Sequence, residues 1–443
     1  MPVQKAAQRL EKLFFAFLFI NPLLDVLSGA YIMLIEALSG SSVSQFDMPL
    51  TPSLLIRMFF LLLFALYALL AADKKAVLTM LGIGAAWGLS VAGEFLFFYR
   101  FNLMSDLTYI VRFSYNVAVL VVYARLFQRC GLTRERLMQK LADTFAFSLN
   151  LLSLAILIPY LFQVGYSTYA DRFGYRGFRG FFYSGNDITA IMMSLLPVCI
   201  AFFLQLPRKA SPKRRAAYAT APAFTLVAMC LIGTKTAFIG VGAAVAAPLV
   251  FALVRLFSQK DKTLIVRLGV ILLIFALTLG FLMLFASANV LSEISESFTA
   301  MSDINEREGA ATALLSGRQN KLRRAFDLYR GGGLYCLLFG VGRGTQQFVI
   351  EMDVFEVVLY YGLAGAAALL WLYLKLGVQF LVSLFRRFDL MGLCIAVSLA
   401  LCAGYLTIAG HVLFSVSSGF YFALMLAFSR LYYTPQPEAL RIY

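Results

Sequence analysis

The chain has 443 residues, of which 61% are hydrophobic and 14% charged, whereas a soluble domain is about 45–50% apolar and about 25% charged. This composition excludes an ordinary soluble protein. The net charge of +15 does not call for a nucleic acid partner, because the cytoplasmic loops of membrane proteins collect Lys and Arg.

Apolar runs recur along the whole chain, and each is long enough to cross the hydrocarbon layer as a helix of about 20 residues. They do not alternate at period two, as the strands of an outer-membrane barrel would. The first run is too long for the core of a signal peptide and is expected to be a span. Twelve spans are predicted, near residues 13–35, 52–72, 76–98, 104–124, 141–163, 185–206, 216–233, 236–255, 264–287, 348–372, 390–408 and 411–430. We therefore predict an all-α polytopic membrane protein forming one integral membrane domain, residues 1–443.

Most Lys and Arg residues lie on the side of these spans that also holds both chain ends, so the positive-inside rule predicts cytoplasmic termini. Several cations nevertheless remain on the outer side, where the rule disfavours them. They include Arg57, Arg112, Arg172, Arg176, Arg179, Lys235, Arg307, Arg318, Lys321, Arg324, Arg330 and Arg343. An anion held at the outer face would explain them, since Arg binds phosphate in a bidentate manner. The alternative is that they neutralise nearby acids or lipid phosphates.

The first outer loop, residues 165–186, is rich in Gly, Arg and aromatic residues. Glycine lets the backbone approach a ligand closely. Arg176 and Arg179 are separated by two residues and could together clamp an anion. The alternative is an interfacial loop that is packed by its aromatic side chains.

The second outer loop, residues 288–347, is inserted between predicted spans 9 and 10 and is long for a structureless connection. Ser316 and Gln319 match a capping box and predict the start of a helix. Apolar residues then follow on one helical face and basic residues on another, until three glycines end the pattern: Leu322, Ala325, Phe326 and Tyr329; Arg318, Lys321 and Arg324; Gly331, Gly332 and Gly333. We expect an amphipathic helix on the outer leaflet. A phosphate bound at its N-terminus would offset the unfavourable position of Arg318 in the first turn.

Acidic residues enter the tenth predicted span directly after a glycine-rich turn that contains Arg343. This turn is not a dinucleotide fingerprint, because no strand precedes it. Glu351, Asp353 and Glu356 could simply favour the dipole of the helix they begin. Intramembrane acids are nevertheless functional candidates, and such a carboxylate could accept the proton of a sugar hydroxyl.

Two further predictions concern polar groups within the spans. Asp25 is expected to pair with Arg57 or Arg112. His411 is the only histidine, which excludes a metal site built from several histidines. It lies at the outer end of the last predicted span and could reach the site. A buried histidine with satisfied hydrogen bonds is the alternative.

Four segments occur in an order that resembles the superfamily of O-antigen ligases and polymerases. They are FRGFFYSGNDITAIMMSLLP (178–197), GTKTAFIGV (233–241), SGRQNKLRRAFDLY (316–329) and LLFGVGRGTQQFVIEMDVFEVVLYYGLAG (337–365). Ligases of this family commonly have a histidine where this chain has Glu351-Met352-Asp353, which favours a polymerase or another envelope-glycan transferase. The GTKT turn also departs from the family's usual serine and arginine, and Lys235 would replace that arginine.

The resemblance implies a glycosyltransferase of the bacterial cytoplasmic membrane that uses an undecaprenyl-diphosphate-linked glycan and an acceptor glycan or lipid-glycan, without cofactor or metal. It also implies that Arg176 or Arg179, together with Arg318, binds the diphosphate. Lys235 and Arg343 are further candidates for that role, and Arg324 and His411 are secondary ones. Glu351 or Asp353 would be the catalytic base, and a single displacement would invert the anomeric centre.

The alternative function is a flippase or another polysaccharide transporter, since twelve helices with cytoplasmic termini are common there. Transporters tend to show internal repeats and broken helices at mid-membrane. No convincing repeat relates the two halves of this chain, and its polar groups gather toward the outer side. The sequence therefore favours the transferase.

Overall fold

The computed structural model describes residues 2–41, 51–71, 73–98, 102–168, 177–286, 349–433 and, within 290–345, all except 293, 296–298, 300–305, 308, 310, 311, 313 and 314. The predicted all-α fold is confirmed. Among the described residues, 11 helices are long and apolar enough to cross a membrane. They are α1 (Pro2–Ser39), α2 (Pro52–Leu70), α3 (Lys74–Gly93, continued by the π-helix η1, Glu94–Phe98), α4 (Leu103–Arg129), α5 (Arg134–Leu161), α6 (Gly185–Leu204), α7 (Pro212–Ile232), α8 (Lys235–Gln259), α9 (Thr263–Phe285), α13 (Asp353–Arg386) and α14 (Leu390–Ile408).

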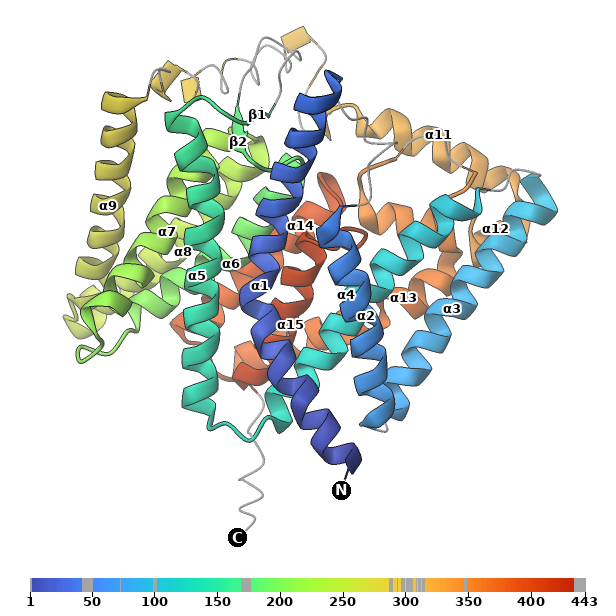
Figure 1. Ribbon diagram of the computed structural model, residues 1–443, viewed down its shortest axis with the longest axis horizontal. Helices are drawn as coiled ribbons and strands as arrows, with labels where there is room; N and C mark the ends of the chain where they lie inside the picture. Colours follow the sequence, from blue (N-terminus) through green and yellow to red (C-terminus); the bar gives the residue numbers. More distant parts are fainter. Residues whose placement is uncertain are drawn as a thin grey trace.

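A shorter helix, α15 (Ser418–Tyr433), follows α14 and occupies the centre of the bundle (Figure 1). It packs against α4 and α6, and nearly all its side chains are buried. At the edge of the bundle, α9 instead exposes Leu273, Leu277 and Leu284, as expected of a surface that faces lipid. α15 therefore lies in the protein interior, whereas α9 lies at the edge of the bundle.

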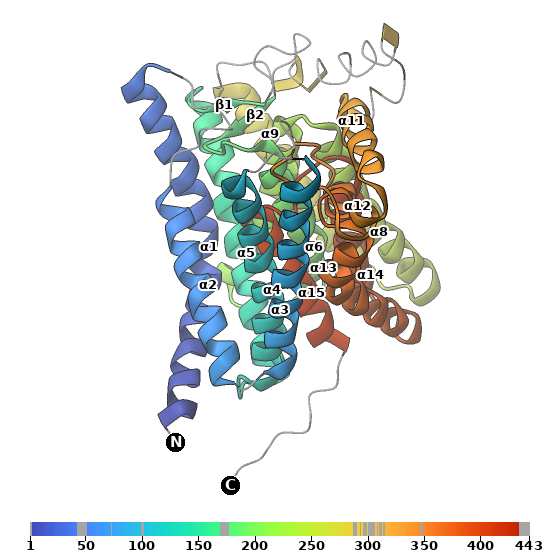
Figure 2. The same ribbon diagram turned by 90° about the vertical axis from the view of Figure 1, so that its right-hand side faces the viewer.

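The bundle has two unlike ends (Figures 1 and 2). One end holds the start of α1 and the end of α15. The other end carries the short strands β1 (Tyr166–Ser167) and β2 (Phe178–Gly180), which pair antiparallel, and the helices α11 (Arg318–Gly331) and α12 (Gly333–Phe339). We call this second end the α11 face. The two predicted outer loops thus contribute to the same face.

Hydroxyl side chains fix where several helices begin. Thr51, Ser184, Ser211 and Thr234 each accept a hydrogen bond from a backbone N–H of the first turn of α2, α6, α7 and α8, respectively. Such caps satisfy backbone donors that have no partner within the helix. Two of these caps, Thr51 and Ser184, also line the cavity described below.

The start of α15 differs from the sequence prediction. The twelfth span is predicted from residue 411, but the helix begins at Ser418, and residues 409–417 form a non-helical loop. The side-chain amide of Asn116 on α4 donates to the carbonyl oxygens of Leu413 and Ser415 at 2.9 and 2.8 Å. This buried amide replaces the missing helical hydrogen bonds, and periodicity alone does not reveal such a partner.

The predicted capping box at Ser316 and Gln319 is wrong. The N-cap of α11 is Gly317, with φ +80°, and no side chain caps the helix. The side chain of Gln319 donates instead to the hydroxyl of Thr312. Left-handed backbone at Gly317 turns the chain into the helix, so Ser316 cannot occupy the capping position. The predicted end of α11 at the three glycines is confirmed.

The glycine-rich turn after α12 packs into a break in α13. Gly362 has φ +67° and interrupts α13. The N–H groups of Val341 and Gly342 donate to the carbonyl oxygens of Leu359 and Tyr360, at 3.0 Å each. The turn therefore satisfies carbonyl groups that the broken helix leaves open.

We expect Gly340→Ala to disrupt this contact. A Cβ atom at residue 340 would lie 2.1 Å from the carbonyl oxygen of Tyr360, and the residue has φ +84°. Overpacking and left-handed strain together should lower the free energy of unfolding by roughly 2–4 kcal/mol. Thermal unfolding in detergent measures this effect. Gly377→Ala on the same helix as the break is the control, because nothing lies within 4 Å of its Cβ position. Equal melting temperatures for the two variants would contradict the packing described here.

Candidate functional site

The first residue of α13, Asp353, anchors the loop between α14 and α15. One carboxylate oxygen accepts hydrogen bonds from the N–H groups of Val412 and Leu413 at 2.5 and 2.7 Å. The other oxygen lies 3.3 Å from Nδ1 of His411. The side chain of Asp353 is fully buried. These contacts fix the position of His411 relative to the start of α13.

Glu356, one turn further along α13, is a second buried acid beside His411. Its Oε1 atom accepts from the N–H groups of Ile350 and Glu351 at 2.9 and 3.0 Å. Its Oε2 atom lies 3.6 Å from Nδ1 of His411. Burial disfavours the imidazolium, but the carboxylates of Glu356 and Asp353 outweigh that effect and raise the pKa of His411 to about 9. His411 is therefore a cation at neutral pH and cannot serve as a general base there.

The raised pKa predicts how this contact depends on pH. Because the pKa of His411 rises from 6.5 to about 9 on folding, its stabilising contribution is complete below about pH 6.5 and is lost as the pH rises through about 9. The gap in melting temperature between the wild type and His411→Asn should thus be largest near pH 6 and narrow by pH 10. A gap that stays constant or widens with rising pH would show that His411 is not held as an imidazolium.

A second ion-pair group joins α11 to the segment before α13. The Arg318 guanidinium donates to Oε2 of Glu351 through Nη2 at 2.7 Å and Nε at 3.1 Å, and Nζ of Lys321 lies 3.6 Å from Oε1. Burial favours the neutral acid, but these cations hold the pKa of Glu351 below its ordinary value. Glu351 has φ +64°, which is costly for a residue with a Cβ and is typical of functional sites. We call Arg318, Lys321 and Glu351 the Arg318 cluster.

The donor atoms of Asp353, Glu356 and His411 lie within 4.8 Å of one another, so their spacing is compatible with a metal ion. A bound divalent cation would need the neutral form of His411, because a protonated ring nitrogen cannot be a ligand. Nδ1 of His411 instead lies 3.3 Å from a carboxylate oxygen of Asp353 and 3.6 Å from one of Glu356, which are ion-pair contacts. The arrangement therefore fits an ion-paired cluster better than a metal centre.

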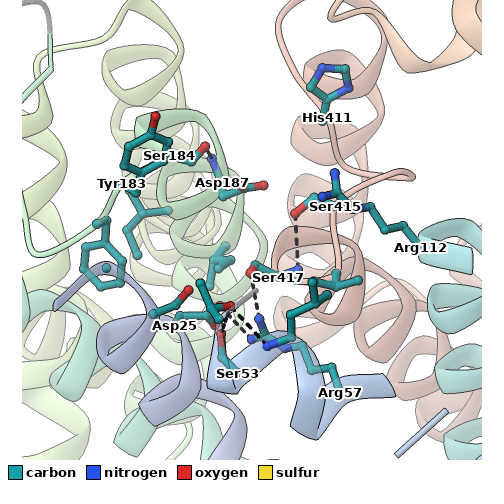
Figure 3. Close-up of a pocket in the computed structure, with 18 of the residues that line it drawn as sticks. Asp25, Ser53, Arg57, Arg112, Tyr183, Ser184, Asp187, His411, Ser415 and Ser417 are labelled. Carbon is teal, nitrogen blue, oxygen red and sulfur yellow. Dashed lines mark hydrogen bonds and ion pairs between the residues drawn. The ribbon is translucent and has the colours of Figure 1, made fainter. Parts of the chain in front are cut away.

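A cavity of about 240 Å³ opens beside His411, and we call it the outer cavity (Figure 3). Residues of α1, α2, α4, α6 and the 409–417 loop line it. Its floor is a buried ion pair in which Arg57 donates to Asp25 at 2.6 Å, and Arg57 also bonds Asn21 and Ser417. The predicted pairing of Asp25 with Arg57 is confirmed.

Two charged side chains face each other across the upper part of this cavity. Figure 3 shows Asp187 extending from the start of α6 and Arg112 extending from α4 toward it, with His411 above them. One oxygen of Asp187 accepts a hydrogen bond from the hydroxyl of Ser418 at 2.8 Å. Within the part of the chain that the structure describes, no acidic side chain lies within ion-pair distance of Arg112.

The other predicted cations surround these two groups. Arg179 on β2 lies over the rings of Tyr166 and Tyr183, at 5.4 and 5.9 Å, and Tyr183 lines the outer cavity. Lys235 begins α8 and lies close enough to Arg318 for their charges to repel. Arg324 is exposed on α11. Arg176 lies outside the described residues.

Arg343 occupies a more enclosed position than the sequence predicts. Its side chain is 6% exposed, and its guanidinium lies 5.1 Å from the ring centre of Tyr109, which lines the outer cavity. Two buried acids hold its backbone: Asp106 accepts from the N–H groups of Arg343 and Gly344 at 2.9 Å each, and Glu94 accepts from Gly344 at 2.7 Å. Arg343 is thus held behind the cavity wall rather than at the α11 face.

The structure brings Arg318 and His411, which are distant in sequence, to Glu351 and Asp353 at the start of α13. The sequence does not single out Asp187, and it marks Lys321 and Arg112 only as two of the predicted outer cations that could hold an anion, with Arg112 also a candidate partner for Asp25. The available signal for Arg112 was its position on the predicted outer side, where the positive-inside rule disfavours a cation. The signal for Asp187 was weaker, because an acid in the first turn of a helix needs no functional explanation.

The chain was also compared with known proteins. No curated protein and no solved structure matches it significantly. The family described as O-antigen ligase like membrane protein matches residues 7–310, which is more than half of the chain. The chain therefore belongs to the O-antigen ligase like family of membrane proteins.

Proposed function

We propose that this protein transfers a glycan from an undecaprenyl-diphosphate carrier to an acceptor hydroxyl at the outer face of the bacterial cytoplasmic membrane. It would act as a cell-surface polysaccharide polymerase or ligase. Membership in the O-antigen ligase like family supports the general activity. The observation that carries the specific proposal is the Arg318 cluster, which lies at the α11 face near His411, a residue that lines the outer cavity.

Arg318 is suited to bind the diphosphate of the donor. It begins α11, a helix of 14 residues whose first N–H groups have no helical partners, and such a helix end attracts anions. Lys321 lies one turn further on, and Lys235 adds positive charge nearby. Cations at this point would stabilise the negative charge that develops on the diphosphate as it leaves.

Glu351 is the residue that we assign as the base. In the absence of a donor, it is the counter-ion of Arg318. A diphosphate that bound Arg318 would replace Glu351 in that ion pair. The carboxylate would then lose the contact that depresses its pKa, so donor binding would make Glu351 a stronger base.

The reaction would be a single displacement. The acceptor oxygen would bond to the anomeric carbon as the bond from that carbon to the diphosphate oxygen breaks, and the diphosphate would leave with the electron pair. The acceptor proton would pass to Glu351, and the anomeric centre would invert. Asp353 is less suited to accept this proton, because both its oxygens are already engaged and it is fully buried. It would position His411 and the start of α13.

The direct test is a transfer assay with purified protein and defined undecaprenyl-diphosphate oligosaccharides. The proposal predicts longer lipid-linked chains, or transfer to a lipid-glycan acceptor, without any nucleotide sugar. Mass spectrometry of the products would detect either outcome. Failure of the folded protein to extend or transfer any donor of the panel would contradict the proposal.

The proposal also requires the α11 face to lie outside the cell. A cysteine introduced at the exposed residue Asp327 on α11 should react with a membrane-impermeant maleimide in intact cells, in a background without native cysteines. A cysteine at the exposed residue Lys213, in the first turn of α7 (Pro212–Ile232), should react only after lysis, because α7 begins at the opposite end of the bundle. The reverse pattern would place the Arg318 cluster in the cytoplasm and exclude the proposed reaction.

A further inference from the structure

Two charged side chains in the walls of the outer cavity, Arg112 and Asp187, do not form an ion pair with each other. Arg57 and Asp25 form a buried pair at the floor. Above them, one oxygen of Asp187 is held by Ser418, while Arg112 has no ion-pair partner among the described residues. A cation and a carboxylate that face each other across a gap, rather than pairing directly, leave room for a ligand between them (Figure 3).

The charge balance of these walls disfavours a phosphate as the ligand. Asp25 and Asp187 offset Arg57 and Arg112, while the charge of His411, which also lines the cavity, is held by Asp353 and Glu356 behind it. An anion placed here would meet two carboxylates. A neutral ligand with several hydroxyl groups fits better, because it can donate to Asp187 and accept from Arg112 in the same position.

The remaining wall residues provide hydroxyl groups for the polar edge of a sugar ring and aromatic surface for its apolar face. Ser53, Ser415 and Ser417 offer further hydroxyl groups, while Tyr183 and Phe414 contribute aromatic surface. A binding site with a mainly apolar lining and a few placed polar groups is typical for small molecules. The volume of about 240 Å³ is smaller than the roughly 300–1,000 Å³ of sites for drug-sized ligands, so the cavity suits one ring rather than an oligosaccharide.

We infer that the outer cavity binds the terminal sugar ring of the acceptor glycan, with Asp187 and Arg112 as its specificity-determining contacts. This inference rests on the proposed function. The first sugar of the donor carries both a diphosphate and the rest of its glycan, whereas the acceptor ends in a ring with one attachment. A cavity for one ring therefore fits the acceptor. His411 lines the cavity and lies close enough to Glu351 for its charge to lower the pKa of that acid. The acceptor would therefore lie beside the Arg318 cluster.

Binding of soluble sugars tests this inference without requiring transfer. The probes are methyl pyranosides of neutral hexoses, N-acetylhexosamines and uronic acids, measured by saturation-transfer NMR on the full-length protein in nanodiscs. At least one neutral pyranoside should bind, and Arg112→Gln and Asp187→Asn should each weaken its binding by about tenfold or more. Arg430→Gln and Asp327→Asn, which replace exposed residues elsewhere, should leave binding unchanged. Arg112→Lys keeps the charge and should restore part of the affinity.

The inference is overturned if no neutral pyranoside binds, if only uronic acids bind, or if both cavity variants bind as the wild type does. The melting temperature of each variant shows whether a loss of binding reflects misfolding, and Arg112→Lys provides the second variant if Arg112→Gln does not fold.

In the transfer assay, the cavity variants should raise the KM for the acceptor and leave the KM for the donor unchanged. An increase confined to the donor KM would contradict the assignment to the acceptor. If the protein bound sugars in the cavity but transferred no glycan, the proposed function would be refuted, whereas sugar binding by the cavity would stand.

Discussion

Replacing Arg318 by alanine is expected to lower the rate of glycan transfer by roughly two to three orders of magnitude, the typical effect of removing one group that stabilises developing negative charge. Arg318 contributes two hydrogen-bond donors to Glu351 in the absence of a donor lipid and would offer the same two to the diphosphate. Arg318→Lys should recover little activity, because an ammonium cannot make the bidentate contact. Initial rates with a lipid-linked glycan measure the effect.

Arg323→Ala is the matched control for Arg318→Ala. Arg323 lies on the same helix and carries the same charge, but its side chain is exposed and no ion pair within the described part of the chain involves it. Its replacement changes the general positive charge of α11 without touching the Arg318 cluster. Equal losses of activity in the two variants would show that only the overall charge of the helix matters. Full activity in folded Arg318→Ala would exclude Arg318 from the site.

Glu351→Gln is expected to lose the rate of transfer, whereas Asp353→Asn is expected to lose stability. Loss of a general base costs typically 10²–10⁴-fold in rate, so Glu351→Gln should fold normally and transfer very slowly. Asp353 holds two backbone N–H groups and the imidazolium of His411 in a fully buried position. Breaking such a buried charge pair costs about 3–5 kcal/mol, so Asp353→Asn should lower the melting temperature sharply.

The two variants are compared by thermal unfolding and by rate at equal amounts of folded protein. Glu356→Gln serves as a third variant, because Glu356 is buried beside the same histidine but has no proposed chemical role. It should resemble Asp353→Asn. A stable Asp353→Asn variant that lacks activity, beside an active Glu351→Gln variant, would transfer the role of base from Glu351 to Asp353.

The fold was predictable because the membrane imposes simple constraints on sequence. A spanning segment must be apolar for about 20 residues, and cytoplasmic loops gather Lys and Arg, so spans can be read from composition alone. The sequence did not reveal the loop at residues 409–417, since it depends on the side chain of Asn116 from a distant helix. It also gave the wrong cap for α11, because the left-handed conformation of Gly317 competes with the capping-box pattern.

The candidate site was predictable only in part. A cation on the predicted outer side, such as Arg318, and an acid beside the start of a predicted span, such as Glu351, stand out in the sequence without any structural knowledge. Their partners do not, because pairs such as Arg318 with Glu351 and His411 with Asp353 join segments that are distant along the chain. The placement of Asp187 opposite Arg112 across a cavity is a property of the packed helices alone.

The most direct measurement is an experimental structure of the protein with undecaprenyl diphosphate in nanodiscs. The account predicts density for the diphosphate within hydrogen-bonding distance of Arg318 at the α11 face, with the contact between Arg318 and Glu351 opened. Diphosphate density in a central cavity that is reachable from both membrane faces would indicate a transporter. Density bound away from Arg318, with the ion pair to Glu351 intact, would contradict the proposed site.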